Sequence, residues 1–178
     1  MVSLKRPERL FHVSEESGIK EFIPRPSLFF IEGIKGDVVF AITESLLHNY
    51  LLPRNCPRVT FYQSPATSPA DKERFMGGIS AGHVIIVESG WYEAIRATTL
   101  YCYEFSPDTF SLIDECAGYY ISYEPLKPVN VKKIENILPE LLTRDIELRF
   151  TPSLIEIAAK VSASSLNFSL IRMRNAKK

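Results

Sequence analysis

Cysteine is scarce in this sequence, and the three cysteines present are widely spaced. Cys56, Cys102 and Cys116 form no C-x-x-C pair and are odd in number. The pattern therefore favours neither a disulfide framework nor a zinc site built on paired cysteines. We predict three buried thiols and a protein of the reducing cytoplasm.

Long hydrophobic runs and a charge excess are also absent. No stretch approaches the ~20 apolar residues of a membrane span, and the N-terminal segment is charged without the apolar core of a secretory signal. Lysine plus arginine and aspartate plus glutamate both number 21, whereas proteins that bind nucleic-acid backbones usually carry a basic excess. The sequence thus predicts no membrane partner and does not indicate a nucleic-acid partner.

Common phosphate-binding and metal-binding motifs are missing as well. The chain contains neither G-x-x-x-x-G-K-[ST] nor G-x-G-x-x-G, so neither a P-loop nor a Rossmann site is predicted. Its three histidines lack the spacing that places two ligands on one face of an element. We therefore predict no metal site.

The sequence matches one catalytic motif by residue type alone. Gly78, Ser80 and Gly82 spell G-x-S-x-G, immediately before His83. A serine nucleophile on this motif requires a strand before it and a helix after it, whereas the local pattern predicts a charged helix before it and a strand after it. We interpret the segment as a glycine-rich loop rather than a hydrolase site.

The composition that remains is that of a globular protein. With 178 residues, 46% hydrophobic and 24% charged, the chain is predicted to form a single domain over residues 1–178. Strand patterns outnumber helical ones and do not alternate with them regularly, so the predicted fold class is α+β with mixed, mainly antiparallel sheets and short helices. The expected strands are 9–14, 38–42, 59–62, 83–88, 98–105, 109–115, 118–125, 146–150 and 166–174.

Three arrangements of these strands and loops are predicted in more detail. The continuous apolar run 83–88 is expected to lie centrally with both faces covered. The aromatic-rich strands between 98 and 125 are expected to form an antiparallel meander. The proline- and glycine-rich segment 19–37 is expected to cross the core as an irregular connection.

Two helices are predicted from spacing and capping residues. Apolar residues recur at helical spacing over 131–142, with a kink or restart expected at Pro139. Thr151 and Pro152 have the residue types of an N-cap and a first helical position, so the last helix is predicted to begin there.

Two pairs of polar side chains are predicted to share strand faces. Because alternate residues of a strand point to the same side, His12 lies with Ser14, and Ser122 lies with Glu124. A carboxylate in an aromatic-rich strand is either desolvated or paired, which is typical of functional sites. The alternative for Glu124 is a solvated strand end.

Three arginines lie in proline-rich loops, namely Arg25, Arg54 and Arg58. Proline stiffens such loops and can hold a guanidinium group ready for a phosphate or a carboxylate. The alternative is ordinary ion pairing at the surface.

Several segments together resemble a known family. LFHVS, VVFAITESLLHNYLLPR and GYYISYEPLKPV, with ES.W near Glu88, resemble a family of small bacterial proteins of unknown function over most of the chain. More distantly, an early strand with H-x-[ST], a strand ending F-A-x-T before a helix, and a late strand carrying a glutamate resemble the ADP-ribosyltransferase fold.

The second resemblance implies roles for individual residues. His12 would hydrogen-bond a ribose of NAD, Glu124 would stabilise the oxocarbenium ion as nicotinamide leaves, and Phe40 or Tyr50 would stack on nicotinamide, although neither matches the usual tyrosine. The predicted binding set is completed by Ser14, Arg25, Arg54, Arg58 and Ser122. The resulting hypothesis is a transferase that uses NAD or another small nucleotide, and the alternative is a non-catalytic ligand-binding or interaction module on the same fold.

Overall fold

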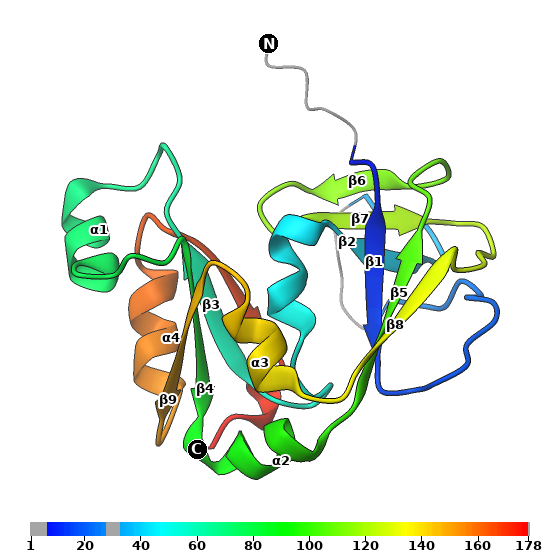
Figure 1. The fold of residues 1–178 in the computed structure, drawn as a ribbon. Helices are drawn as coiled ribbons and strands as arrows, with labels where there is room; N and C mark the ends of the chain where they lie inside the picture. The colour runs from blue at the N-terminus through cyan, green and yellow to red at the C-terminus, as the bar shows by residue number, and fades with distance from the viewer. Residues whose placement is uncertain (1–6, 28–32, 178) are drawn as a thin grey trace. The chain divides into compact units, whose positions relative to one another are not determined.

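A computed structural model describes residues 7–27 and 33–177 (Figure 1). The chain divides into two compact units, each assembled from two separate stretches. The first unit comprises Met1–Tyr50 and Thr99–Glu135, and the second comprises Leu51–Thr98 and Asn136–Lys178. The assignment of residues 1–178 to a single domain stays a prediction.

The first unit is built on a six-stranded sheet in which every neighbouring pair is antiparallel. Its order is β6-β7-β2-β1-β5-β8. The strands are β1 (Leu10–Ser14), β2 (Val39–Ile42), β5 (Leu100–Phe105), β6 (Ser111–Asp114), β7 (Tyr119–Ser122) and β8 (Asn130–Ile134), and the 3-10 helix η1 (Glu44–Tyr50) follows β2. One face carries the apolar core, which contains Leu10, Phe22, Val39, Ala41, Tyr103, Phe105 and Phe110.

The irregular connection between β1 and β2 covers that core. Phe22 is 9% exposed, and its ring packs edge-on against Tyr103 and Phe105 with centroids 5.0 Å apart in each case. The buried Tyr103 hydroxyl donates to the carbonyl oxygen of Glu16 (2.7 Å) and accepts the N–H of Ile19 (3.1 Å). The predicted course over the core is thus confirmed at Ile19 and Phe22, and residues 28–32 lie outside the described residues.

The second unit is built on a four-stranded sheet ordered β10-β3-β4-β9, in which β4 and β9 are parallel and the other pairs antiparallel. The strands are β3 (Arg58–Tyr62), β4 (His83–Glu88), β9 (Ile146–Thr151) and β10 (Asn167–Ile171). The helices are α1 (Pro69–Met76), η2 (Ser89–Trp91), α2 (Tyr92–Ala97), α3 (Ile137–Leu142), α4 (Ile155–Ser162) and η3 (Met173–Asn175).

Two predictions about this unit are confirmed by its strand order and helix ends. β4 lies between β3 and β9, and Val84, Ile85 and Val87 are fully buried, as the unbroken apolar run requires. α1 ends at Met76 and is followed by Gly77, so the glycine-rich segment is a loop between a helix and a strand.

The helix predicted over 131–142 is wrong in its first half. Residues up to Ile134 form the edge strand β8, which pairs with β5, and helix α3 begins at Ile137. Pro139 therefore lies in the first turn of α3. The N–H groups of a first turn have no acceptor within the helix, so a proline there removes no helical hydrogen bond. The apolar residues before and after residue 135 follow one helical spacing in the sequence, but they belong to a strand and a helix, respectively.

The predicted start of the last helix is also wrong. Thr151 ends β9, and α4 begins at Ile155 with Leu154 at its N-cap. The N–H of Leu154 is bound by the buried Glu88 carboxylate at 3.4 Å, so a distant side chain satisfies this end of the helix.

The predicted meander holds for one of its two connections. β6 and β7 pair as an antiparallel hairpin, but β1, β2 and β7 separate β5 from β6. The fold class is α+β, with two mainly antiparallel sheets and short helices. Within the described residues, no helix has both the length and the apolar character needed to cross a membrane.

Candidate functional site

The segments that carry His12, Phe40 and Glu124 meet in the first unit. β7, β2 and β1 are adjacent strands of the six-stranded sheet, although they are far apart in the sequence (Figure 1). β1 carries His12 and Ser14, β2 leads into η1, and Glu124 follows the end of β7. The structure therefore places these three segments side by side.

The strand register aligns the polar residues at one end of these strands. Phe11 pairs with Ile42 across β1 and β2, and Val39 pairs with Ser122 across β2 and β7. Ser14 ends β1 and Ser122 ends β7, and both lie at this end of the sheet on the face that carries Leu10 and Val39.

The imidazole ring of His12 is held in one orientation by its surroundings. Its Nδ1 lies 2.8 Å from the carbonyl oxygen of Phe40. Since a carbonyl only accepts, Nδ1 carries the proton, and in the neutral ring Nε2 is the hydrogen-bond acceptor. The ring packs against Phe22 with centroids 5.0 Å apart and is half-buried.

The two serine hydroxyls at this end organise the chain that follows each strand. Ser14 Oγ accepts the N–H of Glu16 (3.1 Å). Ser122 is fully buried, its hydroxyl donates to Thr109 Oγ1 (3.3 Å), and it accepts the N–H of Glu124 (3.2 Å). Glu124 itself is exposed, beyond the last residue of β7.

Arg25 is brought to the same end of the sheet. Its backbone exchanges two hydrogen bonds with Val38, of 3.1 and 2.9 Å, next to the Val39–Ser122 pair. Phe22, three residues earlier, pairs in the same way with Leu126, which follows Glu124 in the chain. The exposed guanidinium group of Arg25 is therefore carried by a backbone segment that is fastened near the ends of β2 and β7.

Phe40 and Tyr50 lie on the other face of the sheet. Phe40 pairs with Ile121, and its ring packs edge-on against Tyr119 with centroids 6.3 Å apart. The hydroxyl groups of Tyr50 and Tyr119 share a hydrogen bond, and their ring centroids are 6.0 Å apart. Neither proposed stacking residue thus shares a face with His12.

Arg54 and Arg58 belong to the second unit. Arg54 is exposed in the loop before β3, whereas Arg58 is only 2% exposed. The Arg58 guanidinium group donates to the carbonyl oxygens of Pro53 (3.3 Å) and Cys56 (3.0 Å). It therefore holds its own loop together, and neither arginine lies in the unit that contains His12 and Arg25.

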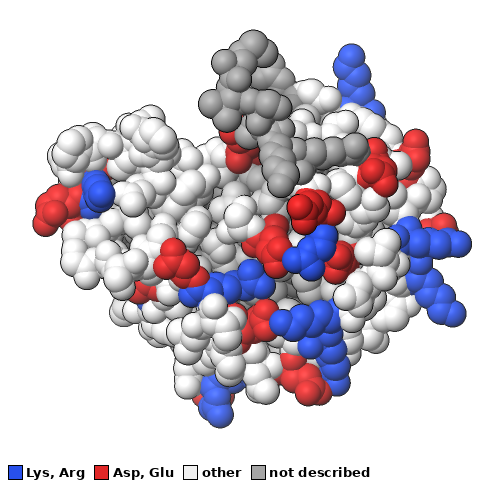
Figure 2. Space-filling model, turned by 45° about the horizontal axis from the view of Figure 1, so that its top comes forward, with Lys and Arg blue, Asp and Glu red and all other residues white. Residues whose placement is uncertain are grey.

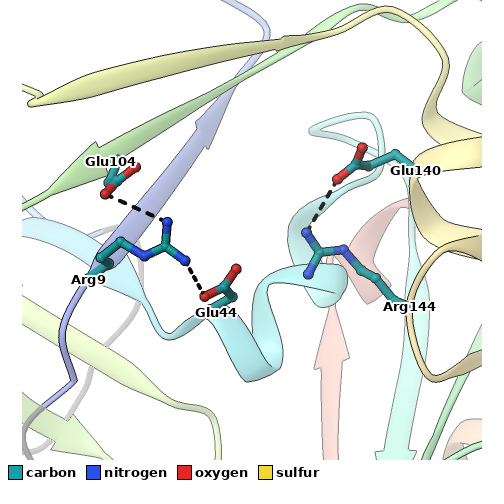
Figure 3. A network of polar contacts seen from close by, with 5 residues as sticks. All are labelled: Arg9, Glu44, Glu104, Glu140 and Arg144. Carbon is teal, nitrogen blue, oxygen red and sulfur yellow. Dashed lines mark hydrogen bonds and ion pairs between the residues drawn. The ribbon is translucent and has the colours of Figure 1, made fainter.

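The exposed charges form small mixed groups. Figure 2 shows side chains of both signs interspersed on one face of the molecule. In the first unit, Arg9 lies 2.8 Å from Glu44 and 3.9 Å from Glu104, and in the second, Arg144 lies 3.3 Å from Glu140 (Figure 3). Within residues 7–27 and 33–177, no group of three or more His, Cys, Asp or Glu side chains is placed to hold a metal ion.

Comparison with known families shows to which family this chain belongs. A model of a family of unknown function, DUF6886, matches residues 11–176. The chain belongs to this family. No curated protein and no solved structure matches it. The DUF6886 match begins at Phe11 and includes both His12 and Glu124, and the predicted membership of a family of unknown function is confirmed.

Within the DUF6886 region, Tyr120 is an aromatic residue that the search for a stacking partner passed over. It pairs with Ala41 and packs against the core that contains Leu10 and Tyr103, on the His12 side of the sheet. Burial, followed by the nearby Glu115 carboxylate, raises the pKa of its hydroxyl. Strand alternation places Tyr120 on the same face as Ser122, so its position on that face was predictable from the sequence.

Proposed function

We propose that this chain binds NAD or a related nucleotide at the end of the six-stranded sheet where β1 and β7 finish, and that it transfers a group from the nucleotide. The supporting observation is the adjacency of β1, β2 and β7. These strands carry the three segments that resemble the ADP-ribosyltransferase fold.

The residues gathered there have complementary tasks. Nε2 of the His12 ring accepts a hydrogen bond from a ribose hydroxyl, and the Arg25 guanidinium group binds phosphate oxygens. The Glu124 carboxylate supplies negative charge near the reacting carbon. Arg54 and Arg58 take no part in this proposal because both belong to the second unit.

The proposed reaction breaks the bond between the nicotinamide nitrogen and C1′ of the ribose. Nicotinamide leaves with the bonding electron pair, positive charge develops on the ribose, and a nucleophile on the acceptor bonds to C1′ and loses its proton. A carboxylate facing that charge favours the transition state, and losing such a group typically lowers the rate by ~10²–10³.

Thermal unfolding with NAD, NADP, ADP-ribose and nucleotide phosphates tests the binding. A ligand that binds the folded state alone stabilises it by ~2.7 kcal/mol at a hundredfold excess over Kd, which raises the melting temperature of a chain of this size by ~5–10 °C. If none of these ligands raises the melting temperature at millimolar concentration, the nucleotide proposal is wrong.

Matched variants then separate binding from transfer. His12→Phe keeps a ring against Phe22 but removes the acceptor, and Arg25→Gln removes the guanidinium group, so both should reduce the thermal shift. Glu124→Gln should keep the shift and lose nicotinamide release. Exposed residues elsewhere, in Arg74→Gln and Glu135→Gln, serve as controls for the loss of one charge.

The alternative, a non-catalytic nucleotide-binding module, is favoured by the engagement of the Ser14 and Ser122 hydroxyls with their own chain. Under this alternative, NAD raises the melting temperature, but no nicotinamide is released with any acceptor. Glu124→Gln would then be indistinguishable from the unmodified chain in both measurements.

A further inference from the structure

The four-stranded sheet of the second unit ends at β9, an edge strand without lysine, proline or a bulge. Natural edge strands are commonly guarded by lysine, proline or a bulge. β8 carries Lys132 and Lys133, and the register of β6 shifts between Leu112 and Asp114. β9 is six residues long and reads IELRFT, and its two charged residues, Glu147 and Arg149, pair with each other.

The backbone of β9 directs hydrogen-bonding groups away from its own sheet. The N–H of His83 donates to the carbonyl oxygen of Asp145 at 3.3 Å, so Asp145 and every second residue after it face β4. The N–H and C=O of Leu148 therefore point outward. In the part of the chain that the structure describes, β9 pairs with no strand other than β4.

The side chains next to Leu148 carry opposite charges on one face. Arg149 Nε donates to Glu147 Oε1 at 2.7 Å, and these side chains are 35% and 39% exposed, respectively. The other face carries Leu148 and Phe150, and Phe150 is 39% exposed. An edge of this kind offers backbone groups, apolar surface and a defined charge order.

We propose that β9 pairs antiparallel with β9 of a second copy of this chain, about a two-fold axis at Leu148. In that register Leu148 faces Leu148 of the second copy, and Glu147 faces Arg149 of the second copy on either side of the axis. Opposite charges directly across an antiparallel pair are stabilising. The result is an isologous dimer in which one edge is complementary to itself.

The order of the charges, Glu147 before Arg149, favours this register and favours a second copy of β9 as the partner strand. An axis at Glu147 would oppose two glutamates, and an axis at Arg149 would oppose two arginines, both of which are unfavourable. Because Leu148 directs its backbone groups outward, it forms the hydrogen-bonded pair with its copy. Glu147 and Arg149 then fall in the closer, non-hydrogen-bonded pairs, with Cα atoms ~4.5 Å apart.

Light scattering coupled to size exclusion, over a series of concentrations, measures the assembly. The unmodified chain should approach twice the 20.2 kDa mass of one chain. Glu147→Arg or Arg149→Glu should each raise the dissociation constant about tenfold or more, since both contacts become repulsive. The double variant Glu147→Arg/Arg149→Glu should restore the dimer, because the swapped charges are again opposite.

The matched control is Lys160→Glu, which disrupts the exposed Glu156–Lys160 pair on α4 and should leave the mass unchanged. A monomer at every concentration would overturn the proposal. So would a dimer that both single variants leave intact, because it would place the contact elsewhere, for example at the uncharged edge of β10.

Cross-linking tests the register independently. Leu148→Cys in a Cys116→Ser background should form an intermolecular disulfide, because Cα atoms of a hydrogen-bonded pair lie ~5.5 Å apart, within disulfide range. Arg149→Cys in the same background should not, since its partner is Glu147 of the second copy. Equal cross-linking of both variants would contradict the axis at Leu148.

Discussion

The two units bury different kinds of polar side chain. Among the described residues, those buried in the first unit are His48, Asn49 and Ser122, whereas the second unit buries the charged Arg58 and Glu88 together with Thr60. In the first unit, the buried Ser122 hydroxyl accepts the N–H of Glu124, two residues further along the chain. In the second, charged groups bind backbone from several segments, so more of its stability depends on individual side chains.

Glu88 is the clearest example in the second unit. It is 5% exposed, and its Oε1 accepts the N–H groups of Leu154 (3.4 Å) and Lys177 (2.9 Å). One carboxylate thus joins the end of β4 to the start of α4 and to the segment after η3. Hydrogen bonds to a charged group are stronger than those between neutral groups.

The largest expected effect follows from removing this carboxylate. Glu88→Leu leaves two N–H groups without their acceptor and should lower the free energy of unfolding by ~2–4 kcal/mol. Urea unfolding followed by circular dichroism measures the loss. Glu88→Gln retains one acceptor oxygen and should be affected less. Equal losses for the two variants would show that the hydrogen bonds contribute little.

A smaller effect is expected from the neutral counterpart in the first unit. Tyr103→Phe removes the hydroxyl that binds Glu16 and Ile19, and should lower the free energy of unfolding by ~1–2 kcal/mol. Hydrogen exchange should locate the change at the amide of Ile19. If this variant is less stable than Glu88→Leu, the contrast between the units is wrong.

The smallest expected effect concerns thiol reactivity rather than folding. Burial raises the pKa of Cys56 to about 11, against the opposing charge of Arg58. Cys116 is exposed in the first unit, so the prediction of three buried thiols is wrong at this residue. Because the thiolate is the reactive form, iodoacetamide at pH ~8 should modify Cys116 rapidly and Cys56 slowly. Mass mapping after a short exposure gives both rates.

The same pKa has a defined consequence for stability. A thiol whose pKa is raised by folding stabilises the folded state fully below its ordinary value of 9.0, and that contribution is lost as the pH rises toward about 11. Cys56→Ala should therefore flatten the alkaline fall in melting temperature. An unchanged fall would assign it to other groups.

The pattern of apolar and polar residues predicted those strands and helices whose burial follows one rule along their whole length. The apolar run in β4 and the alternation in β9 were sufficient to place both strands. Pattern failed where a contact distant in the sequence decides the structure. The N-cap of α4 is Leu154, whose N–H is bound by the distant Glu88, and Val131 lies in a strand because β5 offers an edge.

The candidate site was predictable to the same extent. Alternation correctly placed His12 with Ser14, because it depends only on neighbours in one strand. It could not show that Phe40 lies on the opposite face from His12 or that Arg58 lies in the other unit, since both depend on which strands pair.

The split composition of each unit constrains the order in which a ribosome can complete them. β3 and β4 emerge early, but their sheet lacks β9 and β10 until the last stretch of the chain is made. A two-stranded hairpin is marginal in water. The stretch between Glu88 and Ile146 takes on the order of 3–12 s to translate, and for that time the apolar strand β4 is a segment that a chaperone can recognise.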